Sequence, residues 1–357
     1  MNLVLVISSL QAGGAERVMT EMANYWAVEG HRIRLITFAP SASDDFYPLD
    51  PRVERISLDY RRDTNGISEK LVFNWTRLLA LRRQLTRLRP AAVISFMDST
   101  NVLSILASAG LGAKTLISIR NNPKSRSLPY FWSLGRRLTY RFATAVVAQT
   151  EGAADWLRQS LGVSAVVIPN PLPSFAPIAI DKEPLVLCVG RLIYEKAHDT
   201  LISAFSRIAH EHPSWRLVIL GDGPLREKLN AQISELELTN RVVLVGAVKD
   251  VATWYAKASV YVHSSRSEGF PNALLEAMAM SLPVVSTKCE FGPTDIIEHG
   301  ENGLLVESDD IEGLASAIVS LISSPRLRND LGRTASLVKE KYDQRRIMGR
   351  WEELVVQ

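Results

Sequence analysis

Residues 260–287 read VYVHSSRSEGFPNALLEAMAMSLPVVST and contain three successive elements. VYVHSS and PVVST are short runs rich in β-branched residues, which is typical of buried strands. The segment between them has the composition of a helix, and Pro271 suits the first turn of that helix. A strand, a helix and a second strand in this order predict two parallel strands joined by a crossover helix.

The same alternation extends over the whole chain of 357 residues. The other strand-like runs are NLVLVIS (2–8), HRIRLITF (31–38), AAVISF (91–96), TLISI (115–119), AVVAQT (145–150), LVLCVG (185–190), WRLVILG (215–221) and RVVLVG (241–246). Helix-length segments separate them, so we predict an α/β protein with two doubly wound parallel sheets. Ligands of such sheets bind at the carboxyl ends of the strands, which makes the loops after these runs the informative ones.

A proline-rich segment divides the two halves. Residues 168–184 exclude a continuous helix or a central strand because they contain five prolines: Pro169, Pro171, Pro173, Pro177 and Pro184. We therefore predict a first domain over 1–168, a linker over 169–184 and a second domain over 185–338.

The formal net charge of +3 conceals a difference between the two halves. Residues 1–170 carry a net charge of +8, and residues 171–357 a net charge of −5. From Lys70 to Arg141 there are 13 basic residues and one acid, Asp98. Such a field predicts an anionic partner, and no stacking aromatics of a known nucleic-acid module accompany it.

Two basic amphipathic segments, 69–89 and 128–143, combine arginines with tryptophan, tyrosine and phenylalanine. This mixture is favoured at a membrane interface, so we predict contact with an anionic membrane surface. The alternative is that the apolar faces pack on the sheet and the arginines only solubilise them.

Composition also indicates where the protein works. The two cysteines match neither a disulfide framework nor a metal pattern, which favours a reducing, cytoplasmic setting. The apolar start lacks a basic region, so we interpret it as a buried strand and not as a signal peptide. No apolar run approaches the about 18 residues of a membrane-spanning helix.

Glu268 precedes the predicted helix of residues 271–280, and Glu276 lies inside it. Backbone N–H groups around Phe270, Asn272 and Ala273 would be free at the helix start and could face a polar ligand. A carboxylate accepts two hydrogen bonds side by side, which makes Glu276 a reasonable partner for a ribose diol. The alternative places Glu276 on a solvated helix face and Glu268 in an ordinary loop.

Two cations follow the run LVLCVG. Arg191 comes directly after Gly190, and Lys196 follows five residues later. An arginine fork and a lysine point charge at a strand end suit a diphosphate. The alternative is that Arg191 pairs on the surface with Glu195 or Asp199. The chain has no Asp-x-Asp and no metal-ligand spacing of its six histidines, so we expect no metal cofactor.

Two glycine turns complete the set. Gly13 and Gly14 open a helix after the first strand, where backbone amides can approach a phosphate, although the dinucleotide fingerprint is absent. GDGP, beginning at Gly221, follows another strand and suits a turn before a helix.

In their order and spacing these motifs resemble the retaining glycosyltransferases of family 4, which have the GT-B fold of two Rossmann-like domains facing a central cleft. SEGFPNALLEAMA, followed by PVVST and GENGLLV, carries most of the resemblance, which spans nearly the whole chain. GGAER and SIRNNP are similar to a subgroup that builds bacterial surface polysaccharides and lipid-linked oligosaccharides. Ala197 stands where relatives often have glycine, and Arg120 follows the fifth strand where many have a histidine nearby.

The resemblance implies a role for each motif. Catalysis would rest on Glu268 facing the donor sugar and on Arg191 and Lys196 at the diphosphate, with Glu276 on the ribose. The remaining donor-binding residues would be Gly13, Gly14, Gly190, Gly221, Gly269, Phe270, Pro271 and Asn272. On the acceptor side we place Glu16, Arg77, Arg82, Arg120 and Asn121. The final helix, 339–357, would pack back on the first domain.

The predicted function is therefore transfer of a hexose or N-acetylhexosamine, with retention, from a nucleoside-diphosphate sugar, with a UDP-sugar as the expected donor. The acceptor would be a polyprenyl-diphosphate-linked glycan at the inner face of the cytoplasmic membrane, where the enzyme would be peripheral. The alternatives are a nucleotide-sugar 2-epimerase of the same fold and a noncatalytic nucleotide-sugar-binding module.

Overall fold

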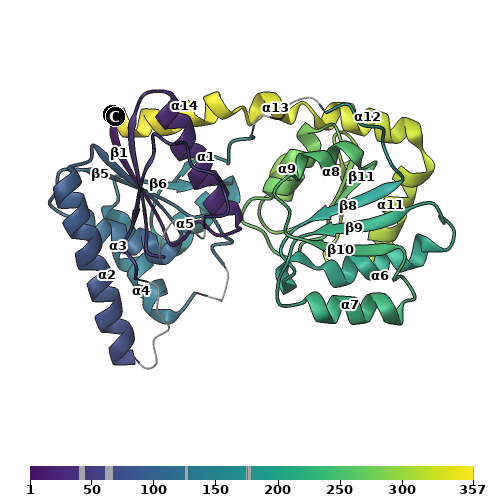
Figure 1. The fold of residues 1–357 in the computed structure, drawn as a ribbon, viewed down its shortest axis with the longest axis horizontal. Helices are drawn as coiled ribbons and strands as arrows, with labels where there is room; N and C mark the ends of the chain where they lie inside the picture. Colours follow the sequence, from purple (N-terminus) through teal and green to yellow (C-terminus); the bar gives the residue numbers. More distant parts are fainter. Residues whose placement is uncertain (40–44, 61–66, 125–127, 174, 176–177, 357) are drawn as a thin grey trace. The chain divides into compact units, whose positions relative to one another are not determined.

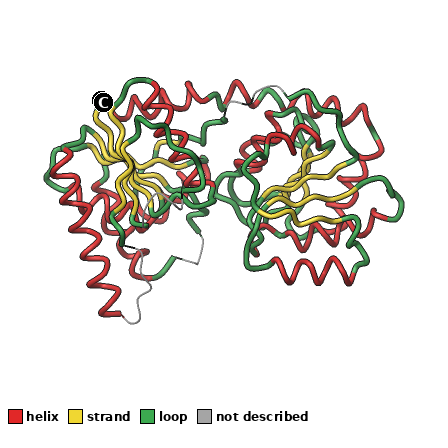
Figure 2. Tube along the Cα trace, in the orientation of Figure 1, coloured by secondary structure: helices red, strands yellow, loops and turns green. Residues whose placement is uncertain are grey.

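The computed structural model describes residues 1–39, 45–60, 67–124, 128–173, 175 and 178–356. It divides into two compact units, Met1–Pro171 with Arg345–Gln357, and Leu172–Gln344 (Figure 1). Of the predicted linker, residues 174, 176 and 177 lie outside the described part. Each unit is an α/β structure with a parallel sheet between helices (Figure 2), as the sequence predicted.

The described strands of the first unit form one sheet with the order β3-β2-β1-β4-β5-β6-β7. Every neighbouring pair is parallel, and β1 lies centrally because it pairs with both β2 and β4. The strands are β1 (Asn2–Ile7), β2 (Arg32–Thr37), β3 (Glu54–Ser57), β4 (Ala92–Phe96), β5 (Lys114–Ser118), β6 (Ala145–Ala148) and β7 (Val166–Val167). The helices are α1 (Gly14–Val28), α2 (Ile67–Leu88), α3 (Asp98–Ser108), α4 (Tyr130–Thr139), η2 (Tyr140–Phe142), α5 (Glu151–Leu161) and α14 (Gln344–Val356).

Each face of this sheet has its own core. On one face the side chains of β1 and β4 pack with Trp26 of α1 and Trp351 of α14. On the other face they pack with Leu81 and Leu85 of α2 and with Leu103 of α3. The strands are therefore buried on both sides, which explains their continuous apolar runs.

The second unit repeats this plan with the strand order β10-β9-β8-β11-β12-β13. Its strands are β8 (Leu185–Val189), β9 (Arg216–Leu220), β10 (Val242–Gly246), β11 (Val260–His263), β12 (Val284–Thr287) and β13 (Leu304–Val306). Its helices are η3 (Tyr194–Lys196), α6 (His198–Ala209), α7 (Arg226–Glu235), α8 (Ala252–Lys257), α9 (Asn272–Ala279), α10 (Pro293–Ile296), α11 (Ile311–Ser323), α12 (Pro325–Ala335) and α13 (Val338–Lys341). Helices α6, α7 and α11 pack on one face of the sheet, and α8 and α9 pack on the other.

The last segment differs from the predicted continuous helix of residues 339–357. Helix α13 ends at Lys341, and α14 begins at Gln344. The chain leaves the helix at Tyr342, whose carbonyl accepts a hydrogen bond from the Leu172 amide at 2.9 Å and whose ring packs against Phe270. Helix α14 then packs in the core of the first unit, where Trp351 is fully buried.

In the part of the chain that the structure describes, no helix combines the length and the apolarity needed to cross a bilayer.

Candidate functional site

Glu268, in the loop after β11, is the centre of the site in the second unit. Its Oε1 lies 2.5 Å from Lys196 Nζ and 2.9 Å from His263 Nε2, and it accepts a hydrogen bond from Ser265 Oγ at 2.6 Å. No hydrogen bond or ion pair of the other carboxylate oxygen occurs within the described residues. Glu268 is 8% exposed. Glu268 therefore lies in a loop, as the alternative also expected, but it is buried there and bonded to its neighbours.

The surroundings of Glu268 keep it ionised. Burial alone raises the pKa of a carboxyl group. Here the positive charge of Lys196 and the contact with His263 outweigh burial, and they hold the pKa of Glu268 well below its usual value. The carboxylate therefore acts as a hydrogen-bond acceptor and not as a proton donor.

Lys196 is the last residue of the short helix η3, and the two residues that follow it fix the backbone of this turn. Ala197 follows it with the left-handed backbone angles φ 49° and ψ 40°, which turn the chain into α6. A glycine at this position would avoid the strain that a side chain has there. The next residue, His198, contacts the Arg191 carbonyl at 3.1 Å through Nε2. Burial lowers the pKa of His198 to about 4, so the neutral ring holds the loop backbone at ordinary pH.

The loop after β9 approaches this turn closely. Gly221 has φ +144°, and a Cβ atom there would lie 1.9 Å from the Gly190 carbonyl oxygen. The amide of Leu192 donates to the Asp222 carbonyl at 2.9 Å. The sequence predicted a turn before a helix at GDGP, and α7 does begin at Arg226. What the sequence did not show is that glycine is needed because two loops touch.

Glu276 lies inside α9 and is 3% exposed, so the alternative of a solvated helix face is wrong for this residue. Its Oε2 accepts a hydrogen bond from the Tyr255 hydroxyl at 3.2 Å. Pro271 is the N-cap of α9, one position before the predicted first turn. The prediction that the Asn272 amide is free is wrong as well, because this amide donates to the Phe270 carbonyl at 3.1 Å. Gly269 lies between Glu268 and this helix start.

Arg191 is exposed, and no ion pair of it with Glu195 or Asp199 occurs among the residues described. Asp199 instead pairs with Arg266, at 2.9 Å. The second unit thus brings Gly190, Lys196, Gly221 and Glu268 together, whereas the Arg191 side chain forms no hydrogen bond or ion pair with any of these four described residues.

The residues predicted for the first unit come from several of its helices and loops. Helix α1 begins at Gly14 with Gly13 as N-cap, and the Glu16 carboxylate lies directly over Gly13. Arg77 lines a pocket of about 270 Å³ with Ser8, Ser9, Phe38, Ala39, Tyr60 and Phe73. Its guanidinium stacks over the Phe38 ring at 4.1 Å, and burial lowers its pKa to about 10.

The other predicted acceptor residues have structural contacts. Arg82 donates to the Ala107 and Ala109 carbonyls at the end of α3, which stabilises that helix end. Arg120 is buried over the Phe96 ring at 3.7 Å, with its pKa lowered to about 9 by burial. Asn121 follows it and is half-buried.

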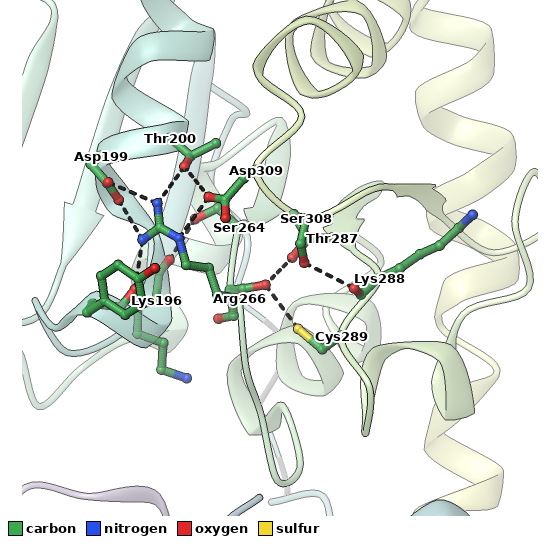
Figure 3. A network of polar contacts seen from close by, with 12 residues as sticks. Lys196, Asp199, Thr200, Ser264, Arg266, Thr287, Lys288, Cys289, Ser308 and Asp309 are labelled. Atoms are coloured by element: carbon green, nitrogen blue, oxygen red, sulfur yellow. Dashed lines mark hydrogen bonds and ion pairs between the residues drawn. The ribbon is translucent and has the colours of Figure 1, made fainter. Parts of the chain in front are cut away.

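Arg266, which was not predicted from the sequence, joins three segments of the second unit (Figure 3). Its guanidinium contacts Asp199 and Thr200 on one side and Asp309 on the other. Ser264 Oγ donates to the Lys196 carbonyl at 2.9 Å, and Thr287 Oγ1 donates to the Ser265 carbonyl at 2.5 Å (Figure 3). A polar run directly after a buried strand was the available signal for these residues.

The described part of the chain contains no cluster of three or more His, Cys, Asp and Glu side chains that could hold a metal ion.

Comparison with known proteins gives consistent matches over both units. The model of the "Glycosyl transferase 4-like domain" matches residues 13–171, and that of "Glycosyl transferases group 1" matches residues 174–338. The chain is 30% identical, over 100% of its length and 99% of the relative's, to GalNAc-alpha-(1->4)-GalNAc-alpha-(1->3)-diNAcBac-PP-undecaprenol alpha-1,4-N-acetyl-D-galactosaminyltransferase of Campylobacter jejuni.

Two further proteins extend the comparison. The N-acetylgalactosamine-N,N'-diacetylbacillosaminyl-diphospho-undecaprenol 4-alpha-N-acetylgalactosaminyltransferase of the same organism is 28% identical, over 96% of each chain. A variant of TarM from S. aureus, crystallised with fondaparinux, alpha-GlcNAc-glycerol and UDP, is similar in fold with a TM-score of 0.84 over 100% of both chains. At 16% identity this last likeness concerns the fold alone.

Proposed function

Because the chain belongs to the family 4 glycosyltransferases, we propose that it transfers a hexose or N-acetylhexosamine from a UDP-sugar to a lipid-linked glycan with retention at the anomeric carbon. The observation that carries this proposal is the Glu268 carboxylate. One of its oxygens is held by Lys196, Ser265 and His263, and the other is left for a donor hydroxyl.

The donor is proposed to bind at the carboxyl edge of the second sheet. Lys196, and Arg191 with a small movement of its exposed side chain, would neutralise the diphosphate. Glu276 would accept hydrogen bonds from the ribose, with Tyr255 fixing one of its oxygens. The named relatives transfer N-acetylgalactosamine, and the TarM variant was crystallised with UDP, which favours a UDP-sugar.

The proposed chemistry needs charge stabilisation at the leaving group more than a nucleophile. As the glycosidic bond breaks, negative charge develops on the departing diphosphate, and cations that are already in place lower the barrier. The leaving phosphate oxygen would then take the proton of the incoming hydroxyl on the same face. The ionised Glu268 would orient the sugar, since it has no proton to give.

The same cations support a proposal of metal independence. Lys196 and Arg191 supply the charge that a divalent ion supplies in other nucleotide-sugar enzymes. We expect turnover to stay the same in excess EDTA, and a loss of more than about tenfold that added Mg²⁺ or Mn²⁺ restores would contradict this part of the proposal.

The acceptor is proposed to be a polyprenyl-diphosphate-linked glycan that reaches the first unit at a membrane surface. Helix α3 contacts both α2 and α4, so these three helices lie side by side. Exposed on α2 and α4 are Val72, Trp75, Leu79, Tyr130, Phe131, Leu134 and Leu138. Arg83, Arg87, Arg137 and Arg141 are exposed on the same helices and on η2. Leu81 and Leu85 are buried in the core of the first unit, as the alternative of internal apolar faces expects.

This arrangement supports a cytoplasmic enzyme held peripherally at the inner face of the membrane. Co-sedimentation with vesicles containing phosphatidylglycerol should fall as salt rises, because electrostatic attraction is screened. Binding that is equal on neutral vesicles and unchanged by salt would contradict the proposed role of the arginines. The Arg77 pocket is the candidate contact for the acceptor glycan in this unit.

The decisive experiment is a panel of UDP-sugars with and without a lipid-linked acceptor extract, followed by mass and anomeric analysis. The proposal predicts a product one sugar heavier with the donor's anomeric configuration. A new UDP-sugar formed without acceptor would instead identify a 2-epimerase, and tight binding without any conversion would identify a noncatalytic module.

A further inference from the structure

Arg266 has an acceptor for each of the five N–H donors of its guanidinium. Nε donates to Asp309 at 2.7 Å, and Nη1 donates to the Tyr194 carbonyl at 2.9 Å. The remaining three bonds reach both oxygens of Asp199, at 3.0 and 2.9 Å, and the Thr200 hydroxyl at 3.0 Å. The guanidinium also stacks on the Tyr194 ring at 4.4 Å. A planar fork satisfied in this way fixes the position of every group around it.

The backbone next to Arg266 holds the same turn. The Arg266 amide donates to the Glu195 carbonyl at 2.8 Å, and Ser264 Oγ donates to the Lys196 carbonyl at 2.9 Å. Three consecutive carbonyls, those of residues 194, 195 and 196, are therefore bonded by the segment 264–266. Two residues further along the chain, the Glu268 carboxylate accepts a hydrogen bond from the Lys196 ammonium group.

The turn that is held in this way is strained. Ala197 adopts φ 49°, and Asp309 on the other side of Arg266 adopts φ 61°, although neither is glycine. Thr200 links these two parts, because its hydroxyl donates to Asp309 at 2.9 Å. Residues in such conformations persist only where the surroundings over-determine them. The contacts of Arg266 are the most numerous of these surroundings.

We propose that Arg266 is a positioning residue, which fixes the turn of residues 194–200 so that Lys196 and Glu268 stay in register for the donor diphosphate and sugar. It acts through Lys196 and does not contact the donor itself. The inference rests on the proposed function, since the register matters only if the donor binds there. A solely stabilising surface ion pair is the competing explanation, because Asp199 and Asp309 are partly exposed.

Arg241 provides a matched control. All three nitrogens of its guanidinium also donate hydrogen bonds, to the carbonyls of Ala209, His212 and Trp215. It lies directly before β10, at the amino ends of the parallel strands, whereas Arg266 lies at their carboxyl ends. Arg241→Met should therefore destabilise the unit by a similar mechanism without touching the turn of Lys196.

The first measurement is hydrogen exchange of the full chain without donor. Arg266→Met should raise exchange at least tenfold in peptides covering 194–200, and Arg241→Met should leave those peptides unchanged. Unchanged exchange at 194–200 in Arg266→Met would overturn the proposal. If Arg266→Met fails to fold, Asp309→Asn weakens one arm of the network by removing its negative charge and should show the same local pattern more weakly.

The second measurement is a double-mutant cycle of turnover. Arg266→Met should lower kcat at least tenfold in the natural chain and less than threefold in a Lys196→Met background, and Arg266→Lys should not restore the loss. Equal losses in both backgrounds would overturn action through Lys196. A chain that transfers no sugar at all would contradict the proposed function, whereas the exchange result would still decide the positioning of the turn.

Discussion

Replacing Glu268 by glutamine tests the ionised carboxylate directly, because the shape of the side chain is kept and only its charge is lost. In the natural chain Lys196 Nζ and Ser265 Oγ donate hydrogen bonds to the same oxygen, at 2.5 and 2.6 Å. Hydrogen bonds to a charged partner are worth about 1.5–3 kcal/mol, against about 1 kcal/mol for neutral ones. Two such bonds weakened in a buried site predict a loss of about 2 kcal/mol in the unfolding free energy of the second unit.

The loss should depend on pH in a defined direction. The pKa of Glu268 is depressed in the folded protein. Its stabilising effect is therefore complete above the unfolded pKa of about 4.3 and is lost as the pH falls below that value towards the folded pKa. The difference in stability between the natural chain and Glu268→Gln should shrink when the pH is lowered from about 7 to about 3.5.

Pulse-labelled hydrogen exchange along a urea series, measured on peptides of β11 and β12, follows the second unit alone. Glu183→Gln is the control, since Glu183 pairs with Arg216 and Lys257 at the surface and should cost less than about 0.5 kcal/mol. The reasoning is refuted if both variants lose equal stability, or if the Glu268→Gln difference stays constant with pH. Turnover should fall about 10- to 150-fold, and full turnover would exclude an essential role for the charge.

Three further predictions concern neighbouring positions. Ala197→Gly relieves a left-handed backbone conformation and should stabilise the second unit by about 0.5–1 kcal/mol in urea unfolding, after the greater chain entropy of glycine is subtracted. Gly221→Ala places a Cβ atom 1.9 Å from the Gly190 carbonyl oxygen. The variant should lose more than about 3 kcal/mol of stability, with UDP binding weakened beyond calorimetric detection. Tyr255→Phe removes the hydroxyl bonded to Glu276 and should raise the Kd for UDP about fivefold, measured by calorimetry, with the far-UV spectrum unchanged.

Most of the fold could be predicted from the sequence because parallel strands that are buried on both faces consist of continuous apolar runs. The strand-like runs of both halves correspond to β1, β2, β4, β5, β6, β8, β9, β10, β11 and β12. The strands that were not identified, β3, β7 and β13, lie at sheet edges. Glu54–Ser57 of β3 contains no fully buried residue, so it lacks the apolar run on which the prediction depended.

The site was predictable as a set of motifs but not as a set of contacts. Spacing alone put Glu276 inside a helix, but both faces of that helix remained possible until the structure showed it buried beside Tyr255 of α8. Lys196 and Glu268 are 72 residues apart, and only the adjacency of β8 and β11 brings their loops together. The role of Arg266 could not be predicted from the sequence for the same reason, because its partners Asp199 and Asp309 come from two other segments of the chain.

Lys196 has a partner in the described chain before any donor arrives, and this affects how the donor would bind. When a diphosphate binds Lys196, the ammonium group exchanges one anionic partner, Glu268, for another. It therefore avoids the cost of being buried without a counter-ion. Glu268 then loses part of the positive field that lowers its pKa, and a more basic carboxylate accepts a stronger hydrogen bond from a sugar hydroxyl. The network around Arg266 holds the backbone of both loops (Figure 3), so this exchange needs only the Lys196 side chain to move. Under the proposed function, diphosphate binding and sugar orientation are therefore coupled through a single ion pair.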